Sequence, residues 1–271
     1  MTHTPGSEFR ALHRPGEPFV LANAWDAGSA KMLAALGAQA IGTSSAAHAF
    51  TLGRPDMGHV SRDEALTHAA DLVAAVNIPV SGDFENGFGE APDVVAQTVR
   101  LSGEAGLAGI SIEDTALPDS APYPFDLAVE RIRAGAAAAR DLPKDFMLVA
   151  RADGIMNGHY DIEEALKRIR AFDAAGADCL YVALPKSADD LARICGATDK
   201  PVNALAAGPT YSALSRAQYA AYGVARISLG STLARATHRV IYDAAKAIFE
   251  QGDFSPVGNV LPGKITDELL R

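Results

Sequence analysis

Residues 162–184, IEEALKRIRAFDAAGADCLYVAL, contain the unit that decides the fold of this chain. The first part, residues 162–175, places apolar residues at the i, i+3, i+4 spacing of an amphipathic helix. Gly176 supplies a helix stop signal, and the short apolar run 179–184 is typical of a buried strand. A helix that ends at Gly-Ala and leads directly into a strand is the join expected in a parallel α/β sheet.

The same unit recurs along the chain, with further Gly stop signals at Gly37, Gly106 and Gly223. Strands are predicted at 19–24, 40–45, 79–85, 109–114, 146–153, 179–184, 201–206 and 225–230. Ala-rich helical patterns cover 27–36, 62–75, 91–105, 127–140, 162–175, 188–195 and 215–222. Eight strands that alternate with helices predict a (β/α)8 TIM barrel.

The main alternative is a doubly wound open sheet. It is disfavoured because no GxGxxG follows the first strand, where Asn23-Ala24-Trp25-Asp26 stands instead. We therefore expect residues 1–271 to form one barrel domain. Residues 240–271 would form a C-terminal helical segment, and an eighth barrel helix with a frayed end fits the pattern equally well.

Composition limits the function classes. The chain has 48% hydrophobic and 21% charged residues and a net charge of −9, with no Lys/Arg block, which argues against nucleic-acid binding. No apolar run reaches about 18 residues, and the N-terminus has no basic segment followed by an apolar core, so we expect no membrane association and a cytoplasmic location. Cys179 and Cys195 lie outside any metal-binding spacing, and we expect both to be core thiols.

Polar side chains follow most of the predicted strands. In a TIM barrel the reacting groups come from the C-terminal strand ends and the loops after them. These positions hold Trp25, Asp26, Thr43, Ser44, Ser45, Asp83, Glu85, Glu113, Asp114, Arg151, Asp153, Asn203 and Ser228. The convergence of at least four acidic residues and one arginine exceeds what contact with water requires, and it predicts an active site.

A metal site is predicted around residues 81–90, SGDFENGFGE. Asp83 and Glu85 are two apart on a strand, so they would share a face, and their repulsion would favour a bound cation. An isolated Asp-x-Glu is more often a solvated turn, but Glu113 and Asp114 at the next strand end favour the metal. The expected ion is Mg²⁺, with Mn²⁺ as the alternative, held directly or through its waters.

The expected substrate is anionic. Arg151 offers a fork for a carboxylate or phosphonate, and main-chain donors at 43–46 offer a second anion site. A 2-oxo acid would chelate the metal through its carbonyl and carboxylate oxygens. The metal would then stabilise the enolate that forms when the neighbouring bond breaks.

Several motifs together carry a family resemblance. They are NAWD (23–26), GTSS (42–45), LGRPD (52–56), GDFENGFG (82–89), SIED (111–114), ARAD (150–153), PVN (201–203) and RISLG (226–230). In this order and at strand ends, they resemble the isocitrate lyase/phosphoenolpyruvate mutase superfamily, which includes methylisocitrate lyase, phosphonopyruvate hydrolase and oxaloacetate decarboxylase. The resemblance spans essentially the whole barrel.

The resemblance implies roles for individual residues. It makes Asp83, Glu85 and Glu113 the metal residues, and Asp56, Glu113 and Arg151 the catalytic ones, with Asp56 near the metal's water network. Substrate binding falls to Trp25, Ser44, Ser45, Ala46, Arg151 and Asn203. It also implies a homo-oligomer, either a dimer or a tetramer, in which helices from 240–250 and 265–270 pack between subunits.

One segment departs from the family pattern. The C–C lyases carry a Lys-x-Cys-Gly-His lid after the fourth strand, but residues 115–126, TALPDSAPYPFD, contain no Cys, Lys or His. This disfavours isocitrate-type lyases and weakens C–P chemistry. The remaining expectation is a Mg²⁺-dependent lyase whose substrate is a small, oxaloacetate-like 2-oxo or 2-hydroxy di-acid. The reaction would be cleavage of a C–C bond or decarboxylation.

Other interpretations stay open at this level. One is phosphonopyruvate hydrolase or phosphoenolpyruvate mutase chemistry, and another is a catalytically reduced binder of 2-oxo acids. His48 and His159 are candidate proton donors, although an ordinary loop histidine is the simpler interpretation of each. The proline-rich residues 118–124 are a candidate lid.

Overall fold

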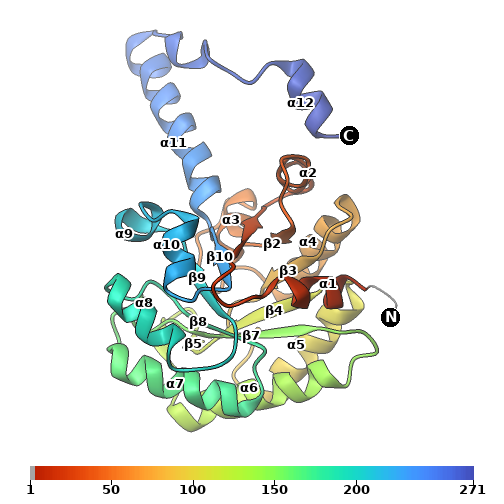
Figure 1. Ribbon diagram of the computed structural model, residues 1–271. Helices are drawn as coiled ribbons and strands as arrows, with labels where there is room; N and C mark the ends of the chain where they lie inside the picture. Colours follow the sequence, from red (N-terminus) through yellow and green to blue (C-terminus); the bar gives the residue numbers. More distant parts are fainter. Residues whose placement is uncertain (1–3) are drawn as a thin grey trace.

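A computed structural model describes residues 4–271. Eight parallel strands close into a barrel in the order β1-β10-β9-β8-β7-β4-β3-β2 (Figure 1). They are β1 (Phe19–Asn23), β2 (Ala40–Gly42), β3 (Val80–Asp83), β4 (Gly109–Glu113), β7 (Met147–Ala152), β8 (Cys179–Val182), β9 (Val202–Leu205) and β10 (Arg226–Ser228). Each predicted strand is present, which confirms the (β/α)8 barrel.

The predicted helices are also present. They are α2 (Ala27–Ala35), α4 (Arg62–Ala75), α5 (Pro92–Glu104), α6 (Phe125–Arg140), α7 (Ile162–Ala175), α8 (Ala188–Cys195) and α10 (Arg216–Ala221). Helix α7 begins after Asp161, whose side chain accepts hydrogen bonds from the Glu163 and Glu164 N–H groups, and it ends at Gly176 with φ +103°. The local signals of a cap and a glycine therefore set both ends of this helix.

The two faces of the strands pack into different cores. Outward side chains such as Ile110, Leu148 and Leu180 pack under the helices. Inward side chains include Leu21, Met147, Val149, Cys179 and Tyr181. Because neighbouring strand residues alternate between these faces, polar residues near the strand ends can point into the barrel.

Helix α1 (Pro5–Leu12) closes the bottom of the barrel and was not expected from the sequence. Phe9 on this helix is fully buried and meets Phe19 of β1 edge-on, with 6.0 Å between ring centroids. His13, the residue that ends the helix, packs against both rings. The barrel interior is thus sealed at the end away from the strand-end loops.

Three local structures differ from the prediction. Strand β2 ends at Gly42, and α3 (Ser45–Thr51) begins where the strand was expected to continue, because the Ser44 hydroxyl caps the helix by accepting from Ala47 N–H (3.3 Å). Residues 115–122 form a small antiparallel hairpin of β5 (Thr115–Ala116) and β6 (Ala121–Pro122). A short helix, α9 (Gly208–Ser212), follows β9.

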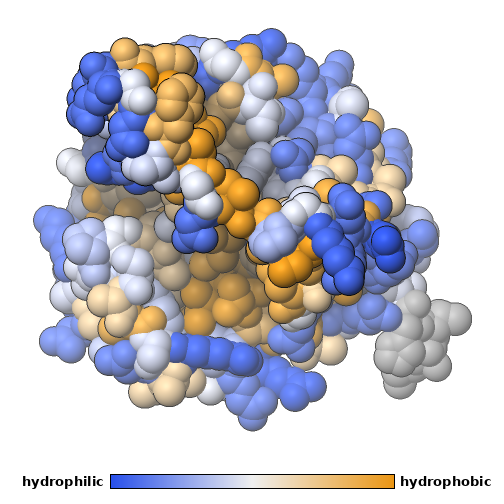
Figure 2. Space-filling view, turned by 90° about the horizontal axis from the view of Figure 1, so that it is seen from above, coloured by the Kyte–Doolittle hydropathy of each residue, from blue (hydrophilic) through white to orange (hydrophobic). Residues whose placement is uncertain are grey.

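The C-terminal helical segment begins earlier than expected, at Thr232 rather than residue 240. It comprises α11 (Thr232–Lys246), the π-helix η1 (Ala247–Gln251), the 3-10 turn η2 (Ser255–Val257) and α12 (Gly263–Leu269), and α11 projects above the barrel (Figure 1). Large apolar side chains are exposed along it, including Val240, Ile241, Phe249 and Phe254. Seen from above, apolar surface lies next to a hollow in the molecule (Figure 2). Among residues 4–271, no helix has the length and apolar character to span a membrane.

Candidate active site

A polar cavity of about 150 Å³ lies inside the barrel and reaches the loops after the strands. Six of the residues to which the family resemblance assigns a role line it: Ser44, Ser45, Ala46, Asp56, Asp83 and Arg151. Its other lining residues are Leu21, Asn23, Gly42, Thr43, Ser81, Gly82, Ser111, Met156, Tyr181, Leu205, Arg226, Ser228, Gly230 and Ser231. The barrel therefore brings together residues from 21 to 231 that are far apart in the sequence.

Asp83 ends strand β3 and is held on both carboxylate oxygens. Its Oδ2 accepts hydrogen bonds from the Ser45 N–H (3.0 Å) and from the Ser45 hydroxyl (2.9 Å). Its Oδ1 accepts from Arg151 Nη1 (3.1 Å). Its own N–H donates to Thr43 Oγ1 (2.8 Å). The loop after β2, predicted to bind a substrate carboxylate, thus also orients Asp83.

Arg151 is surrounded by three carboxylates. Its Nη1 lies 3.1 Å from Asp83 Oδ1 and 3.2 Å from Glu113 Oε2, and its Nη2 lies 2.7 Å from Asp153 Oδ2. Burial opposes the charged form of Arg151, but these carboxylates outweigh burial and raise its pKa. Its guanidinium therefore contacts the protein's own carboxylates while it lines the cavity, and its contact with a substrate anion stays a prediction.

The carboxylates near the cavity carry more negative charge than the single positive charge of Arg151 can balance. Burial raises the pKa of Asp56, Glu113 and Asp153, and Arg151 offsets this only in part. A divalent cation would relieve the same repulsion, and carboxylate oxygens are the donors that Mg²⁺ prefers. Within residues 4–271, no three Asp, Glu, His or Cys side chains already converge on one point. Buried carboxylates of this kind are the donor chemistry that suits Mg²⁺, an ion that usually keeps several of its waters.

Glu85 differs from the sequence-based expectation. Because β3 ends at Asp83 and Glu85 has φ +47°, the rule that alternate strand residues share a face does not apply. Its Oε1 accepts from the Gly58 N–H (3.0 Å), and burial raises its pKa to about 7. It still lines a narrow gap together with Asp83. A non-glycine residue in the left-handed region costs about 1–3 kcal/mol and marks positions where the surrounding structure imposes the conformation.

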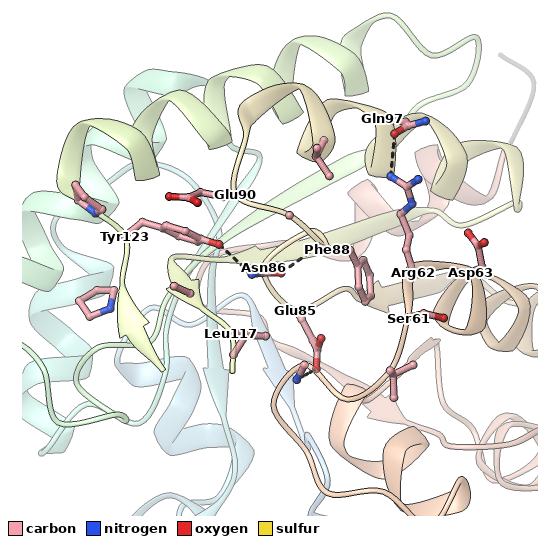
Figure 3. A pocket seen from close by; sticks show the side chains of 17 residues that line it. Ser61, Arg62, Asp63, Glu85, Asn86, Phe88, Glu90, Gln97, Leu117 and Tyr123 are labelled. Carbon is pink, nitrogen blue, oxygen red and sulfur yellow. Dashed lines mark hydrogen bonds between the residues drawn. The ribbon is translucent and has the colours of Figure 1, made fainter. Parts of the chain in front are cut away.

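Glu85 also faces a second, larger cavity of about 840 Å³ (Figure 3). The hairpin after β4 forms one wall, and the Asn86 side chain donates to the Tyr123 hydroxyl (3.0 Å) there. A Cβ added to Gly58 would lie 3.0 Å from Leu117 Cβ, so the loop before α4 packs closely on this hairpin. The described residues of segment 115–126 lie beside Glu85 and do not line the cavity of Asp83.

Three predicted site residues lie elsewhere. Trp25 lines a separate cavity next to α4, where its carbonyl oxygen meets His68 Nε2 (2.9 Å). Inside the barrel, the Asn203 side chain accepts a hydrogen bond from Arg226 Nε and donates one to Ser228 Oγ. Asp114 accepts from Tyr160 and Arg168 rather than facing Asp83. Trp25, Asn203 and Asp114 therefore do not line the cavity of Asp83.

The two candidate histidines are also poorly placed as proton donors. The ring of His48 stacks on His68 at 3.9 Å between centroids, and burial lowers the pKa of His48 to about 4. It is therefore neutral at physiological pH. His159 is exposed on the loop after β7. Cys179 is buried in the barrel interior and Cys195 packs against the outer core, as predicted for core thiols.

Sequence reasoning missed several polar residues that line the cavity, including the following three. Ser111 Oγ lies 3.5 Å from Asp83 Oδ1, and the Tyr181 ring lies 5.3 Å from the Arg151 guanidinium carbon. The third is Arg226, on β10. Alternation in the last strand, where Arg226 and Ser228 flank Ile227, was the available signal for an inward-facing arginine.

Comparison with known proteins assigns the family. Residues 9–249 match the family described as Phosphoenolpyruvate phosphomutase. The chain belongs to this family. It lies within the isocitrate lyase/phosphoenolpyruvate mutase superfamily, as the motifs predicted, and it is an enzyme with carbon–carbon lyase or mutase-type chemistry.

Three relatives illustrate the range of this family. A solved structure from Burkholderia cenocepacia J2315, described as a lyase/mutase, is 43% identical with a TM-score of 0.91, covering 97% of this chain and 94% of that one. Oxaloacetate decarboxylase of Chromohalobacter salexigens is 29% identical over 93% of this chain and 87% of its own length. The 2,3-dimethylmalate lyase of Eubacterium barkeri is 32% identical over 69% of this chain and 66% of its own length.

Proposed function

We propose that this protein is a Mg²⁺-dependent lyase that acts on a small 2-oxo or 2-hydroxy di-acid resembling oxaloacetate. The observation that carries the proposal is the cluster of buried carboxylates around Asp83, which has more negative charge than Arg151 offsets. The similarity to an oxaloacetate decarboxylase and to a dimethylmalate lyase supports the substrate class. The family description keeps C–P chemistry as the alternative.

We assign the metal, the substrate carboxylate and the positioning of the metal ligands to different residues. Asp83 would hold the ion, with Glu85 and Glu113 acting through its waters. A bound Mg²⁺ supplies positive charge that stabilises the enolate formed when the bond next to the 2-oxo group breaks. Arg151 positions Asp83 and Glu113 by binding both. The loop at 44–46 lines the cavity beside Asp83, and we assign it the substrate carboxylate next to the 2-oxo group.

The cavity favours decarboxylation within this class. Among the described residues that line it there is no His, Lys or Cys. Cleavage of a 2-hydroxy di-acid by a retro-aldol step requires a base for the hydroxyl proton and an acid for the product. Loss of CO₂ from a 3-carboxyl group requires neither before the bond breaks. The acid–base side chains that do line it are Asp56, Asp83 and Tyr181. A small cavity without a cysteine, lysine or histidine to protonate a second product therefore suits an oxaloacetate-like acid best.

The experiment is a turnover assay with purified protein, Mg²⁺ and a panel containing oxaloacetate, 2,3-dimethylmalate and phosphonopyruvate. We expect pyruvate release from oxaloacetate that a chelator abolishes and that Asp83→Asn lowers by at least about 100-fold, since it removes a charge-assisted contact. Asp93→Asn, at an exposed position in the first turn of α5, is the matched control. Phosphate release from phosphonopyruvate would favour the C–P alternative. Di-acid binding without any turnover would favour a catalytically reduced binder of 2-oxo acids.

We also propose that the chain forms a homo-oligomer, a dimer or a tetramer, through its C-terminal segment. The exposed apolar side chains of α11 and the residues after it support this, because surface of this kind is usually covered in a stable protein. The double variant Val240→Glu, Ile241→Glu should lower the mass measured by analytical ultracentrifugation. An unchanged mass would argue against this interface.

A further inference from the structure

The cavity that contains Asp83 has a second polar end with a different character. Three hydrogen-bond donors line it from β8 and β10: Tyr181, Arg226 and Ser228. Arg226 is 3% exposed and lies inside the barrel, next to Asn203 in the strand register. Burial raises the pKa of Tyr181, so its hydroxyl keeps its proton and remains a donor.

Arg226 is incompletely satisfied. Its Nε donates to Asn203 Oδ1 (2.8 Å), but its Nη1 is fully buried and has no hydrogen-bond partner among residues 4–271. Within the same residues no carboxylate lies within 4.0 Å of its guanidinium nitrogens. A buried guanidinium remains protonated, and a buried charge without a partner is strongly unfavourable.

The titratable neighbours of Arg226 do not supply a negative charge. Burial raises the pKa of Cys179, which keeps the thiol protonated. Burial, together with Arg226, lowers the pKa of His13 to about 3, so this ring is neutral. Its Nδ1 meets the Phe9 carbonyl oxygen at 2.8 Å. Burial lowers the pKa of Arg226 and the negative charge of Asp83 acts to raise it, but the Asp83 carboxylate already accepts hydrogen bonds from Arg151 and Ser45.

The two arginines of the cavity therefore differ in availability. Arg151 contacts three carboxylates, which balance its charge. Arg226 contacts none. The cavity is acidic around Asp83, where a cation fits, and basic at Arg226, where an anion fits. A di-acid has the complementary pattern, with a chelating 2-oxo or 2-hydroxy carboxylate at one end and a second carboxylate at the other.

We propose that Arg226 binds the second carboxylate of the substrate, with the hydroxyl groups of Tyr181 and Ser228 as additional donors. This proposal rests on the di-acid chemistry proposed above and identifies what would distinguish a di-acid from a mono-acid in this site. A cavity of about 150 Å³ accommodates a ligand of only a few carbon atoms between the two ends. Arg226 is then a specificity-determining residue that contacts the substrate directly.

The test compares ligands that share the chelating end and differ in the second carboxylate. Binding of malate and lactate, a 2-hydroxy di-acid and mono-acid, is measured by calorimetry with Mg²⁺ for wild type, Arg226→Met and Arg226→Lys. We expect Arg226→Met to weaken malate binding by about 10- to 100-fold, as for loss of a charged hydrogen bond, and to leave lactate binding within about threefold. Arg226→Lys should weaken malate less, because it keeps the charge but not the fork.

A structural role for Arg226 predicts a different result. Arg168→Met is the matched control, because Arg168 is equally buried but is ion-paired with Asp114 and Glu164. We expect Arg168→Met to lower the thermal midpoint markedly, whereas Arg226→Met, which removes an unpaired charge, should leave it unchanged or raise it. If Arg226→Met does not fold, that outcome itself assigns Arg226 a structural role.

Two further outcomes would overturn the proposal. One is unchanged malate affinity in Arg226→Met, which would mean that the second carboxylate does not reach the guanidinium. The other is equal weakening of malate and lactate. The proposed lyase function is tested separately. If wild type turns over no di-acid but malate binding still depends on Arg226, the carboxylate site is supported and the proposed reaction is refuted.

Discussion

His13 gives a prediction in which the size of the effect follows from the structure. The residue ends α1 at the bottom of the barrel, 7% exposed, and its ring centroid lies 4.7 Å from that of Phe9 and 4.9 Å from that of Phe19. Its Nε2 is buried without a partner among residues 4–271. Burial lowers the pKa of His13 from 6.5 to about 3, with a smaller contribution from Arg226.

The sign of the pH effect follows from linkage. Between pH 6.5 and about 3, the unfolded chain binds a proton at His13 that the folded protein does not bind. The free energy of unfolding therefore falls as the pH drops below 6.5, by up to about 1.4 kcal/mol per pH unit. At pH 4.5, two units lower, the expected loss from this one residue is about 2.7 kcal/mol. His13→Phe keeps the aromatic packing and removes the titration.

The assay is urea unfolding at pH 7.5 and pH 4.5, followed by circular dichroism in the presence of a chelator. The stability difference between His13→Phe and wild type should shift toward the variant by about 2–3 kcal/mol at the lower pH. Using this difference cancels the other titrating groups, including the carboxylates of the cavity. His159→Asn, at an exposed position, should show no such shift. Parallel pH profiles for wild type and His13→Phe would refute the reasoning.

Three more predictions concern the barrel and its metal. Arg168→Met should destabilise the protein by about 3–5 kcal/mol in urea unfolding, because it leaves the buried Asp114 without its ion-pair partner. Gly109→Ala should also destabilise it, since a Cβ there would lie 2.4 Å from the Met147 carbonyl oxygen of the next strand, whereas Gly263→Ala, with open space around it, should not. Mg²⁺ at 100 times its dissociation constant should stabilise wild type by about 2.7 kcal/mol and Asp83→Asn far less; equal stabilisation would contradict Asp83 as the main ligand.

Much of the barrel follows from local signals. Helix α7 lies where the periodicity places it, because an aspartate cap and a left-handed glycine act within one turn of its ends. The strands follow from short apolar runs after Gly stops. Placing Asp83 and Arg151 in one cavity needed only the rule that strand ends converge in a barrel, and both line it.

Other features depend on contacts between distant segments. The sequence could not indicate that Asp153, Glu113 and Asp83 would occupy the guanidinium of Arg151, because this follows from strand register across β3, β4 and β7. It also missed the role of α1, since a short helix has no periodicity that reveals which opening it closes. Trp25 follows a strand end yet lines a different cavity, because the chain turns outward into α2.

The sequence by itself determined the barrel, its family and the acidic strand ends, because these depend on periodicity, caps and motif order. Only the tertiary structure decided which groups are free. Glu85 leaves the strand with a positive φ, and Arg226 lies buried without a counterion while Arg151 has three. Whether a charge is neutralised depends on what packs against it in space, and neither composition nor spacing along the chain encodes that directly.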